Sequence, residues 1–281
     1  MIVSCIGYGY ISNYLIKELA ADGVICFGIT DKQQHLKKER YENTLILPRK
    51  MTADAINKST HLVITAAPEK NSCPIILKYK KYIENSNIRS IVYVSSTGVY
   101  GNYNGEWVNE KSFIKGKNNP FDKKRILSEI AWIKLCKRKD ISLNIVRLGA
   151  IYGPGRPKIE KKLFKNILIK NNHFFSRIHV LDISRLIVKI LYNSNSFNFW
   201  NIVDDQPSTR KDFITRIIDL KKVKKFNFIN YEDCEDSISQ LKKKFWESNK
   251  KVSNKKIKNS FKYSYLFPTY MSGLKFTIKD T

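Results

Sequence analysis

Short apolar runs of strand length alternate with helix-length amphipathic segments over the first half of the chain. Strands are predicted at residues 2–7, 24–30, 61–68, 90–98 and 142–153. Helices are predicted at residues 11–23, 73–87 and 120–140, the last with Ile126, Ile130, Ile133 and Cys136 near one face. Because strands that alternate with helices pair in parallel, this pattern predicts an α/β fold, a doubly wound parallel sheet with helices on both faces.

The pattern loosens after Gly155. We predict a basic helix at 156–172, a short strand or turn running into a helix at 177–193, a strand at 197–205, and a helix at 208–220 with Ser208 or Thr209 as its N-cap. From about Asp205 the chain is more charged and less regular. Residues 1–204 are therefore predicted to form the sheet domain, with 156–176 contributing to a smaller α/β substrate lobe at 205–281.

Charge and cysteine content narrow the class of protein. The 281 residues carry a net charge of +26, yet only 11 of the basic residues are arginines. Sequence-reading nucleic-acid interfaces depend on arginine forks, so a solvated lysine-rich face is favoured over a nucleic-acid site. The five cysteines are scattered without metal-ligand spacing, and the chain opens in a strand with no signal-peptide pattern. We therefore expect reduced thiols, no metal, no membrane span and a cytoplasmic location.

A glycine turn follows the first predicted strand. Gly7 and Gly9 begin the pattern G-x-G-x-x-G, with Ser12 where a third glycine is usual. The first glycine of such a turn permits a tight bend, and the second lets the backbone approach a pyrophosphate at a helix N-terminus. The second strand ends at Asp31, whose carboxylate can accept hydrogen bonds from ribose hydroxyls. A Rossmann-type site that prefers NAD to NADP is predicted, and the positive charge of Lys32 would weaken that preference. The alternative is that Gly7 and Gly9 only make a tight turn and Asp31 caps a loop.

Five ordered motifs then carry a family resemblance along nearly the whole chain. They are VYVSSTGVYG at 92–101, RLGAIYGPGR at 147–156, RIHVLDI at 177–183, WNIVDDQP at 200–207 and KKVSNKKIKNSF at 250–261. Together they resemble the extended short-chain dehydrogenases/reductases, the NAD-dependent epimerase/dehydratase group that includes nucleoside-diphosphate-sugar epimerases, and more particularly its atypical members. The resemblance implies a Rossmann fold with a substrate lobe.

The resemblance also implies a catalytic site, in which this sequence departs from the family's pattern. Ser96, with Thr97, would hold the substrate oxygen, while the family's tyrosine would move the proton and its lysine would hold the ribose. Counting back from Glu129 gives Phe121 at the tyrosine place and Arg125 at the lysine place. Phenylalanine has no ionisable proton, and arginine stays charged, so the usual proton relay is missing. The coenzyme-binding residues implied are Gly7, Gly9, Tyr10, Ile11, Asp31, Lys32, Ala66 and Arg125.

Other side chains could replace the missing tyrosine. Tyr100, Tyr103 and Tyr152 lie close to the motifs, but each is interpreted as a packing residue. His179 is interpreted in the same way, with a hydrogen bond to backbone or to Asp182 rather than a catalytic role.

Two functions therefore stay open. One is an NAD(P)-dependent oxidoreductase or epimerase-like enzyme for a small hydroxyl- or carbonyl-bearing substrate, such as a nucleotide sugar. The other is a catalytically impaired dinucleotide-binding sensor or partner protein. The resemblance adds a homodimer that pairs through the helix around residues 126–136.

Overall fold

A computed structural model describes residues 1–36, 42–69, 72–158, 160, 164–193 and 196–279. The chain forms two compact units, each of which is described by itself. The first unit consists of Met1–Ser96, Pro120–Arg147 and Ile183–Trp200, and the second of Thr97–Asn119, Leu148–Asp182 and Asn201–Thr281. The predicted domain boundary at residues 204 and 205 stays a prediction; by compactness, residues 97–119 and 148–182 also group with the C-terminal segment.

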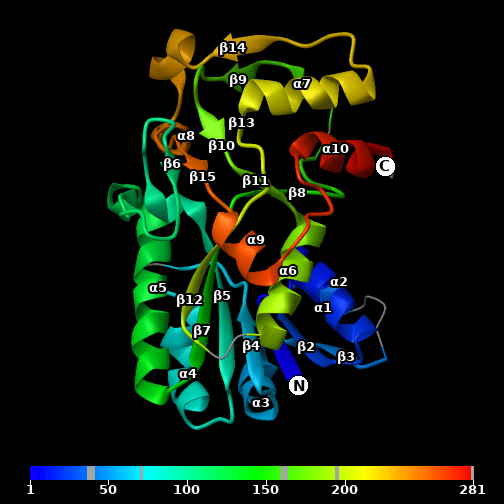
Figure 1. Cartoon of the computed structure of the whole chain (residues 1–281), viewed down its shortest axis with the longest axis vertical. Helices are drawn as coiled ribbons and strands as arrows, with labels where there is room; N and C mark the ends of the chain where they lie inside the picture. The colour runs from blue at the N-terminus through cyan, green and yellow to red at the C-terminus, as the bar shows by residue number, and fades with distance from the viewer. Residues whose placement is uncertain (37–41, 70–71, 159, 161–163, 194–195, 280–281) are drawn as a thin grey trace. The chain divides into compact units, whose positions relative to one another are not determined.

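A seven-stranded parallel sheet forms the centre of the first unit, as Figure 1 shows. Its order is β12-β7-β5-β4-β1-β2-β3. The strands are β1 (Ile2–Ile6), β2 (Ile25–Thr30), β3 (Thr44–Pro48), β4 (His61–Ile64), β5 (Ser90–Ser96), β7 (Ser142–Leu148) and β12 (Asn198–Ile202), the last residues of β7 and β12 belonging to the second unit. The order reverses between β1 and β4, which confirms the predicted doubly wound, Rossmann-type sheet.

Helices cover both faces of this sheet. One face carries α3 (Thr52–Lys58), α4 (Pro74–Glu84) and α5 (Pro120–Lys139), whose apolar residues join the strands in one buried cluster. The other carries α1 (Tyr10–Ala21) and α6 (Val180–Asn193), which are linked by Arg185 and Glu18, 3.7 Å apart. Two short segments, α2 (Gln33–Leu36) and η1 (Arg49–Met51), follow β2 and β3.

Helix α5 buries a different stripe from the one predicted. Ile126 and Cys136 are buried as expected, and Glu129 and Trp132 complete the buried face. Ile130 is 55% exposed, which corrects its predicted place on that face. The physical reason is that the buried face centres near Trp132, and Ile130, two residues away, lies about 160° around the helix from it at about 100° per residue.

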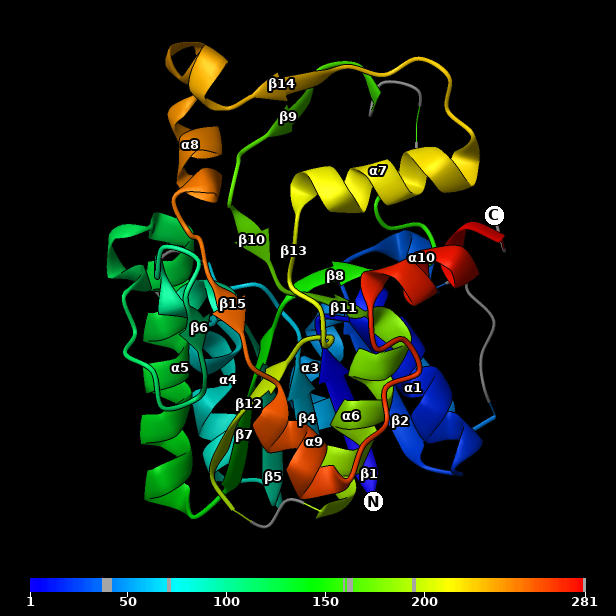
Figure 2. The same ribbon diagram turned by 45° about the horizontal axis from the view of Figure 1, so that its top comes forward.

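In its described residues, the second unit contains four small two-stranded sheets and short helices. The sheets pair β6 (Trp107–Val108) with β15 (Lys251–Val252), β8 (Ala150–Tyr152) with β11 (Arg177–His179), β9 (Ile167–Ile169) with β14 (Phe228–Asn230), and β10 (Phe174–Phe175) with β13 (Ser208–Thr209). The α-helices are α7 (Arg210–Lys221), α8 (Gln240–Trp246), α9 (Lys255–Phe261) and α10 (Tyr270–Lys279), and 3₁₀ turns lie at η2 (Thr97–Tyr100), η3 (Gly116–Asn118) and η5 (Glu232–Ser237). Figure 2 shows α7 and α10 near the β8 and β13 strands. The apolar faces of α7 and α10 share one buried cluster.

Two local predictions in this unit have different outcomes. Thr209 caps α7, because its hydroxyl accepts the Asp212 N–H while the Asp212 carboxylate accepts the Thr209 N–H, so the N-cap prediction is confirmed. The basic helix predicted at 156–172 is wrong where the structure describes it. Residues Ile167–Ile169 form β9 and bury Ile167 and Ile169 against its neighbours, while residues 159 and 161–163 lie outside the described part.

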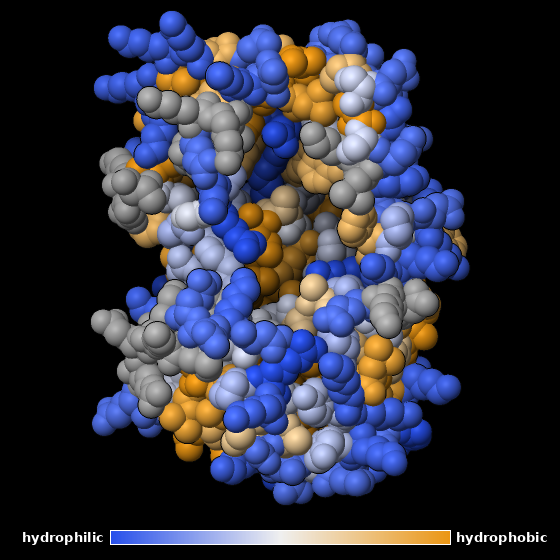
Figure 3. Space-filling view, turned by 180° about the vertical axis from the view of Figure 1, so that it is seen from behind, coloured by the Kyte–Doolittle hydropathy of each residue, from blue (hydrophilic) through white to orange (hydrophobic). Residues whose placement is uncertain are grey.

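The surface agrees with the lysine-rich composition, and Figure 3 shows mostly hydrophilic residues on one face of the molecule. Among the described residues, no helix is long and apolar enough to cross a bilayer. Within the same ranges, no cluster of three or more His, Cys, Asp or Glu side chains is arranged to hold a metal ion.

Candidate functional site

The glycine turn at the end of β1 has a geometry that only glycine can supply at its first position. Gly7 has φ +99°, and a β-carbon there would lie 2.5 Å from the backbone nitrogen of Ala66, just after β4. Ala66 in turn donates its N–H to the Ile6 carbonyl at 3.1 Å. The turn therefore closes tightly against the end of the neighbouring strand, and both residues belong to the predicted coenzyme set.

Ser12, at the place of the third glycine, is buried and hydrogen-bonded. Its hydroxyl lies 2.9 Å from the Thr65 hydroxyl, which donates to the Gly7 carbonyl at 2.8 Å. Because the threonine proton points to Gly7, Ser12 is the donor in the first contact. Ser12 thus joins α1 to the end of β4 by a hydrogen bond, whereas a third glycine would only let the helix and the strand pack closely.

Helix α1 begins at this turn without a side-chain cap. Gly9 is its N-cap residue, and the first turn, which contains Tyr10 and Ile11, has no acidic residue. A β-carbon on Gly9 would meet only the Gly7 carbonyl, at 3.6 Å, so the space beside it is open. The N-terminus of a helix carries a partial positive charge and orphan N–H groups, and both suit a phosphate. The cradle therefore fits the pyrophosphate of a dinucleotide.

Asp31 and Arg49 form an ion pair beyond the carboxyl ends of β2 and β3. Their Oδ2 and Nη1 atoms are 2.7 Å apart, and the side chains are 60% and 33% exposed. Lys32, next in the chain, is exposed and donates its backbone N–H to the Thr30 hydroxyl. The predicted ribose acceptor is therefore present at the edge of the sheet with a cation against it, which sequence reasoning missed.

A buried ion pair supports the serine motif at the end of β5. Arg147 on β7 donates to both carboxylate oxygens of Glu129 on α5, at 3.2 and 2.7 Å, and Ser95 donates to the same carboxylate at 2.6 Å. All three side chains are buried. The pair joins β5, β7 and α5 at Ser95, one residue before Ser96, which ends β5; Thr97, next in the chain, begins η2 and belongs to the second unit.

Arg125 and Phe121, the residues predicted at the lysine and tyrosine places, have other surroundings in the structure. Arg125 donates from Nη1 to the Val94 carbonyl at 2.9 Å, which joins the start of α5 to β5 two residues before Ser96. The Phe121 side chain is 52% exposed and brings no hydroxyl to the site. Nearby Tyr93 is fully buried, and burial raises its pKa to about 12 against the lowering effects of Arg125 and Ser128. The Tyr93 hydroxyl therefore does not supply an acid with a pKa near neutrality.

Tyrosines at the other motifs are held by the second unit's own contacts. The buried Tyr100 hydroxyl donates to Asn201 at 2.7 Å, and the Tyr103 hydroxyl donates to the Phe113 carbonyl at 2.8 Å. Tyr152 is buried, donates to the Thr269 carbonyl, and has a pKa raised well above its ordinary value by burial. These contacts agree with a packing role for each ring.

His179 also has a packing environment, but with partners that differ in part from those predicted. Its Nδ1 accepts the Leu181 N–H at 3.2 Å, and its Nε2 lies 3.3 Å from the Thr277 hydroxyl. Burial lowers its pKa to about 4, so it stays neutral near pH 7. Asp182 instead accepts the Tyr263 hydroxyl and the Leu266 and Phe267 N–H groups, which holds the loop before α10.

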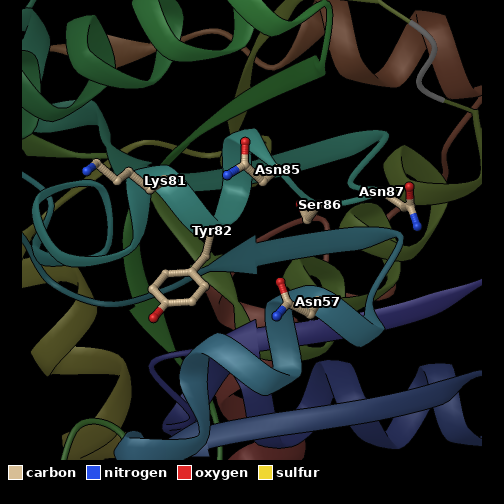
Figure 4. A pocket seen from close by; sticks show the side chains of 6 residues that line it. All are labelled: Asn57, Lys81, Tyr82, Asn85, Ser86 and Asn87. Carbon is tan, nitrogen blue, oxygen red and sulfur yellow. The ribbon is translucent and has the colours of Figure 1, made fainter.

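Two depressions in the structure involve other residues. In the first unit, about 460 Å³ lies at the amino edge of the sheet between α3 and α4, where Figure 4 shows three asparagines with Lys81, Tyr82 and Ser86. In the second unit, about 530 Å³ lies beside Trp107 and the buried Asp204, whose pKa burial raises to about 8. Neither depression contains a residue of the predicted coenzyme site.

Comparisons with known proteins agree with this geometry. The profile of the NAD dependent epimerase/dehydratase family matches residues 7–202. The glycine turn, the Rossmann-type sheet and that match define an extended short-chain dehydrogenase/reductase, and the chain belongs to the NAD-dependent epimerase/dehydratase family. No curated protein matches the sequence.

Solved structures show the same fold over the whole chain. A conserved protein of unknown function from Silicibacter pomeroyi DSS is 25% identical, with a TM-score of 0.90 and 99% and 98% of the two chains covered. The UDP-glucuronic acid 4-epimerase from Bacillus cereus, in complex with UDP-glucuronic acid and NAD, is 15% identical, with a TM-score of 0.78 and 100% and 99% covered. A human epimerase family protein with NADPH is 16% identical, with a TM-score of 0.75 and 100% of both chains covered.

The structure brings the predicted coenzyme residues together at the carboxyl edge of one sheet. Gly7 meets Ala66 where β1 and β4 end, Gly9, two residues later, is the N-cap residue of α1, Asp31 follows β2, and Arg125 contacts β5. Sequence reasoning missed Arg49 and Thr65. Thr65 lies within the strand predicted at 61–68, so its place at the glycine turn could have been inferred, whereas β3, which ends one residue before Arg49, was not predicted at all.

Proposed function

We propose that the chain binds a pyridine dinucleotide at the carboxyl edge of the first unit's sheet. The observation that carries the proposal is the turn at Gly7, which closes on Ala66 and presents an uncapped helix N-terminus beside open space at Gly9. Asp31 stands where an acceptor for ribose hydroxyls belongs. The NAD and NADPH complexes of proteins with this fold support a nicotinamide coenzyme, and Asp31 favours NAD.

The reaction proposed is oxidation, reduction or epimerisation of a small hydroxyl- or carbonyl-bearing substrate. A bound nicotinamide coenzyme would supply hydride chemistry. Ser96, at the end of β5 and next to Ser95, which is bonded to the Glu129–Arg147 pair, would hydrogen-bond the substrate oxygen, with Thr97 next in the chain. Because the hydroxyls of Tyr100 and Tyr152 are buried and already donate hydrogen bonds within the protein, water is the proton carrier in this proposal. A nucleotide sugar is the substrate class suggested by the epimerase complex with UDP-glucuronic acid.

A second candidate is a coenzyme-binding sensor or partner protein without turnover. It is favoured by one observation, the replacement of the tyrosine and lysine by Phe121 and by an arginine whose guanidinium is engaged with the Val94 carbonyl. In that case coenzyme binding alone would be the function. A homodimer through α5, on which Ile130 is exposed, is compatible with either candidate.

Calorimetry with NAD, NADH, NADP and NADPH tests the proposal. At least one coenzyme is expected to bind the purified chain, and Gly9→Val is expected to weaken that binding ~100-fold or more, because its side chain would fill the space of the pyrophosphate. Gly23→Ala is the control for loss of a glycine outside the cradle, since a β-carbon there would meet open space; unlike Gly9, with φ −149°, Gly23 has a positive φ, at +74°. Failure of all four coenzymes to bind the folded protein would overturn both candidates.

Turnover separates the two candidates. The coenzyme-loaded protein would be mixed with UDP-sugars and with simple alcohols, aldehydes and ketones, while coenzyme absorbance and sugar configuration are followed. Conversion that is lost in Ser96→Ala supports the enzyme. Tight coenzyme binding without conversion across the panel supports the sensor.

A further inference from the structure

Arg49 and Asp31 meet because two neighbouring parallel strands end at the same level. In the β2–β3 register Thr30 lies opposite Pro48, so the residues that follow, Asp31 and Arg49, leave the sheet side by side. Their side chains are joined at 2.7 Å. Any ligand group that reaches Asp31 therefore also reaches the guanidinium of Arg49.

The backbone of Arg49 is fixed while its side chain is accessible. The Arg49 carbonyl accepts the Thr52 hydroxyl at 2.6 Å, which anchors η1 to the start of α3. The guanidinium is 33% exposed and the Asp31 carboxylate 60% exposed. An ion pair this exposed contributes only ~0–1 kcal/mol, so exchange of one partner for a ligand anion costs little.

The local charge is mixed rather than acidic. An isolated carboxylate at the adenosine ribose would repel a 2′-phosphate, which is the usual basis for preferring NAD. Here Arg49 neutralises Asp31, and Lys32 adds a second cation, both exposed or half-buried at the same edge. A guanidinium offers a planar fork of donors that matches phosphate oxygens.

We infer that Arg49 determines coenzyme choice, and that it lets the chain bind NADP(H) as well as NAD(H). With NAD, Arg49 stays on Asp31 and the carboxylate accepts the ribose hydroxyls. With NADP, the guanidinium turns from Asp31 to the 2′-phosphate. This inference rests on the proposed dinucleotide site and specifies how that site treats the two coenzyme classes.

The test compares the dissociation constants of NAD and NADP for the wild type and for Arg49→Gln by calorimetry. The wild type is expected to bind the two coenzymes within about tenfold of each other. Arg49→Gln is expected to weaken NADP binding ~10-fold or more through the lost charged hydrogen bonds, and to leave NAD binding within about threefold. Added salt should weaken NADP binding more than NAD binding in the wild type, and this difference should shrink in Arg49→Gln.

Lys50→Gln is the matched control, because Lys50 is adjacent, exposed and of the same charge. It should leave the ratio of the two affinities unchanged. Rejection of NADP by the wild type, an equal loss of both coenzymes in Arg49→Gln, or a Lys50→Gln effect as large as that of Arg49→Gln would overturn the inference. If neither coenzyme binds the wild type, the proposed dinucleotide site itself fails, before any variant is compared.

Discussion

The two ends of the first unit's carboxyl edge differ in what they retain. At β1, β2 and β4, the glycine turn, the uncapped helix and Asp31 together form the proposed dinucleotide cradle. At β5 and α5, the buried Glu129–Arg147 pair holds Ser95 next to Ser96, but Phe121 and Arg125 stand at the positions predicted for the proton relay. The comparison teaches that the supports of a site and its reacting groups can be separated, since each depends on different contacts.

The largest expected effect comes from the buried Glu129–Arg147 ion pair next to the serine motif. Arg147→Met removes the cation from the buried Glu129 while keeping an apolar side chain against the Phe199 ring, so unfolding should become ~3–5 kcal/mol easier. Urea denaturation measures this change. Arg185→Met is the control, because its ion pair with Glu18 is exposed and worth ~0–1 kcal/mol. Equal effects in the two variants would mean that the buried pair is not what holds β5, β7 and α5 together.

The next effect concerns the proton relay. The double variant Phe121→Tyr with Arg125→Lys restores an acid and an ammonium group at the family's places, and general acid–base catalysis typically contributes ~100-fold or more. Reductase or epimerase turnover should rise by about that factor over the wild type, measured by coenzyme absorbance on the same substrate panel. Phe121→Tyr alone is the control and should gain less, since Arg125 keeps its bond to Val94. A folded, coenzyme-binding double variant without any gain would contradict the assigned positions.

The smallest effect is expected at the glycine turn. Ser12→Ala removes the hydrogen bond to Thr65, which still donates to Gly7, so the loss of stability should be ~0.5–1.5 kcal/mol. Coenzyme affinity should change by less than about threefold, because Ser12 is buried behind the cradle. Denaturation and calorimetry on the same preparation check both values. A large loss of affinity at unchanged stability would make Ser12 a ligand contact.

Much of the fold could be predicted from hydrophobic periodicity, and the reasons for the failures are local. The sheet, the family and the Thr209 cap are confirmed, because buried strands, ordered motifs and capping boxes leave strong patterns. The sequence predicts a basic helix at 156–172, yet Ile167–Ile169 pair with β14 as a strand, so tertiary pairing decides the structure there. Strand β3, whose burial alternates only over its first three residues, was missed.

The candidate site was less predictable than the fold. Residues tied to a backbone requirement, such as Gly7, could be identified from spacing, and the structure gives them a physical reason. Partners from other elements could not, because nothing in the sequence indicates that Arg49 meets Asp31 or that Arg125 contacts a β5 carbonyl. The roles of Ser96, Thr97 and Arg125 stay predictions until coenzyme binding and turnover are measured.

The three donors that converge on Asp182 have a practical consequence for anyone who shortens this chain. Tyr263, Leu266 and Phe267 all belong to the last twenty residues, and they attach that stretch to a carboxylate in the interior. Trimming the carboxyl tail before Tyr263 would strip an interior anion of these contacts, so such a shortened protein should be insoluble or readily degraded, whereas removal of residues 280–281 alone leaves the three bonds in place.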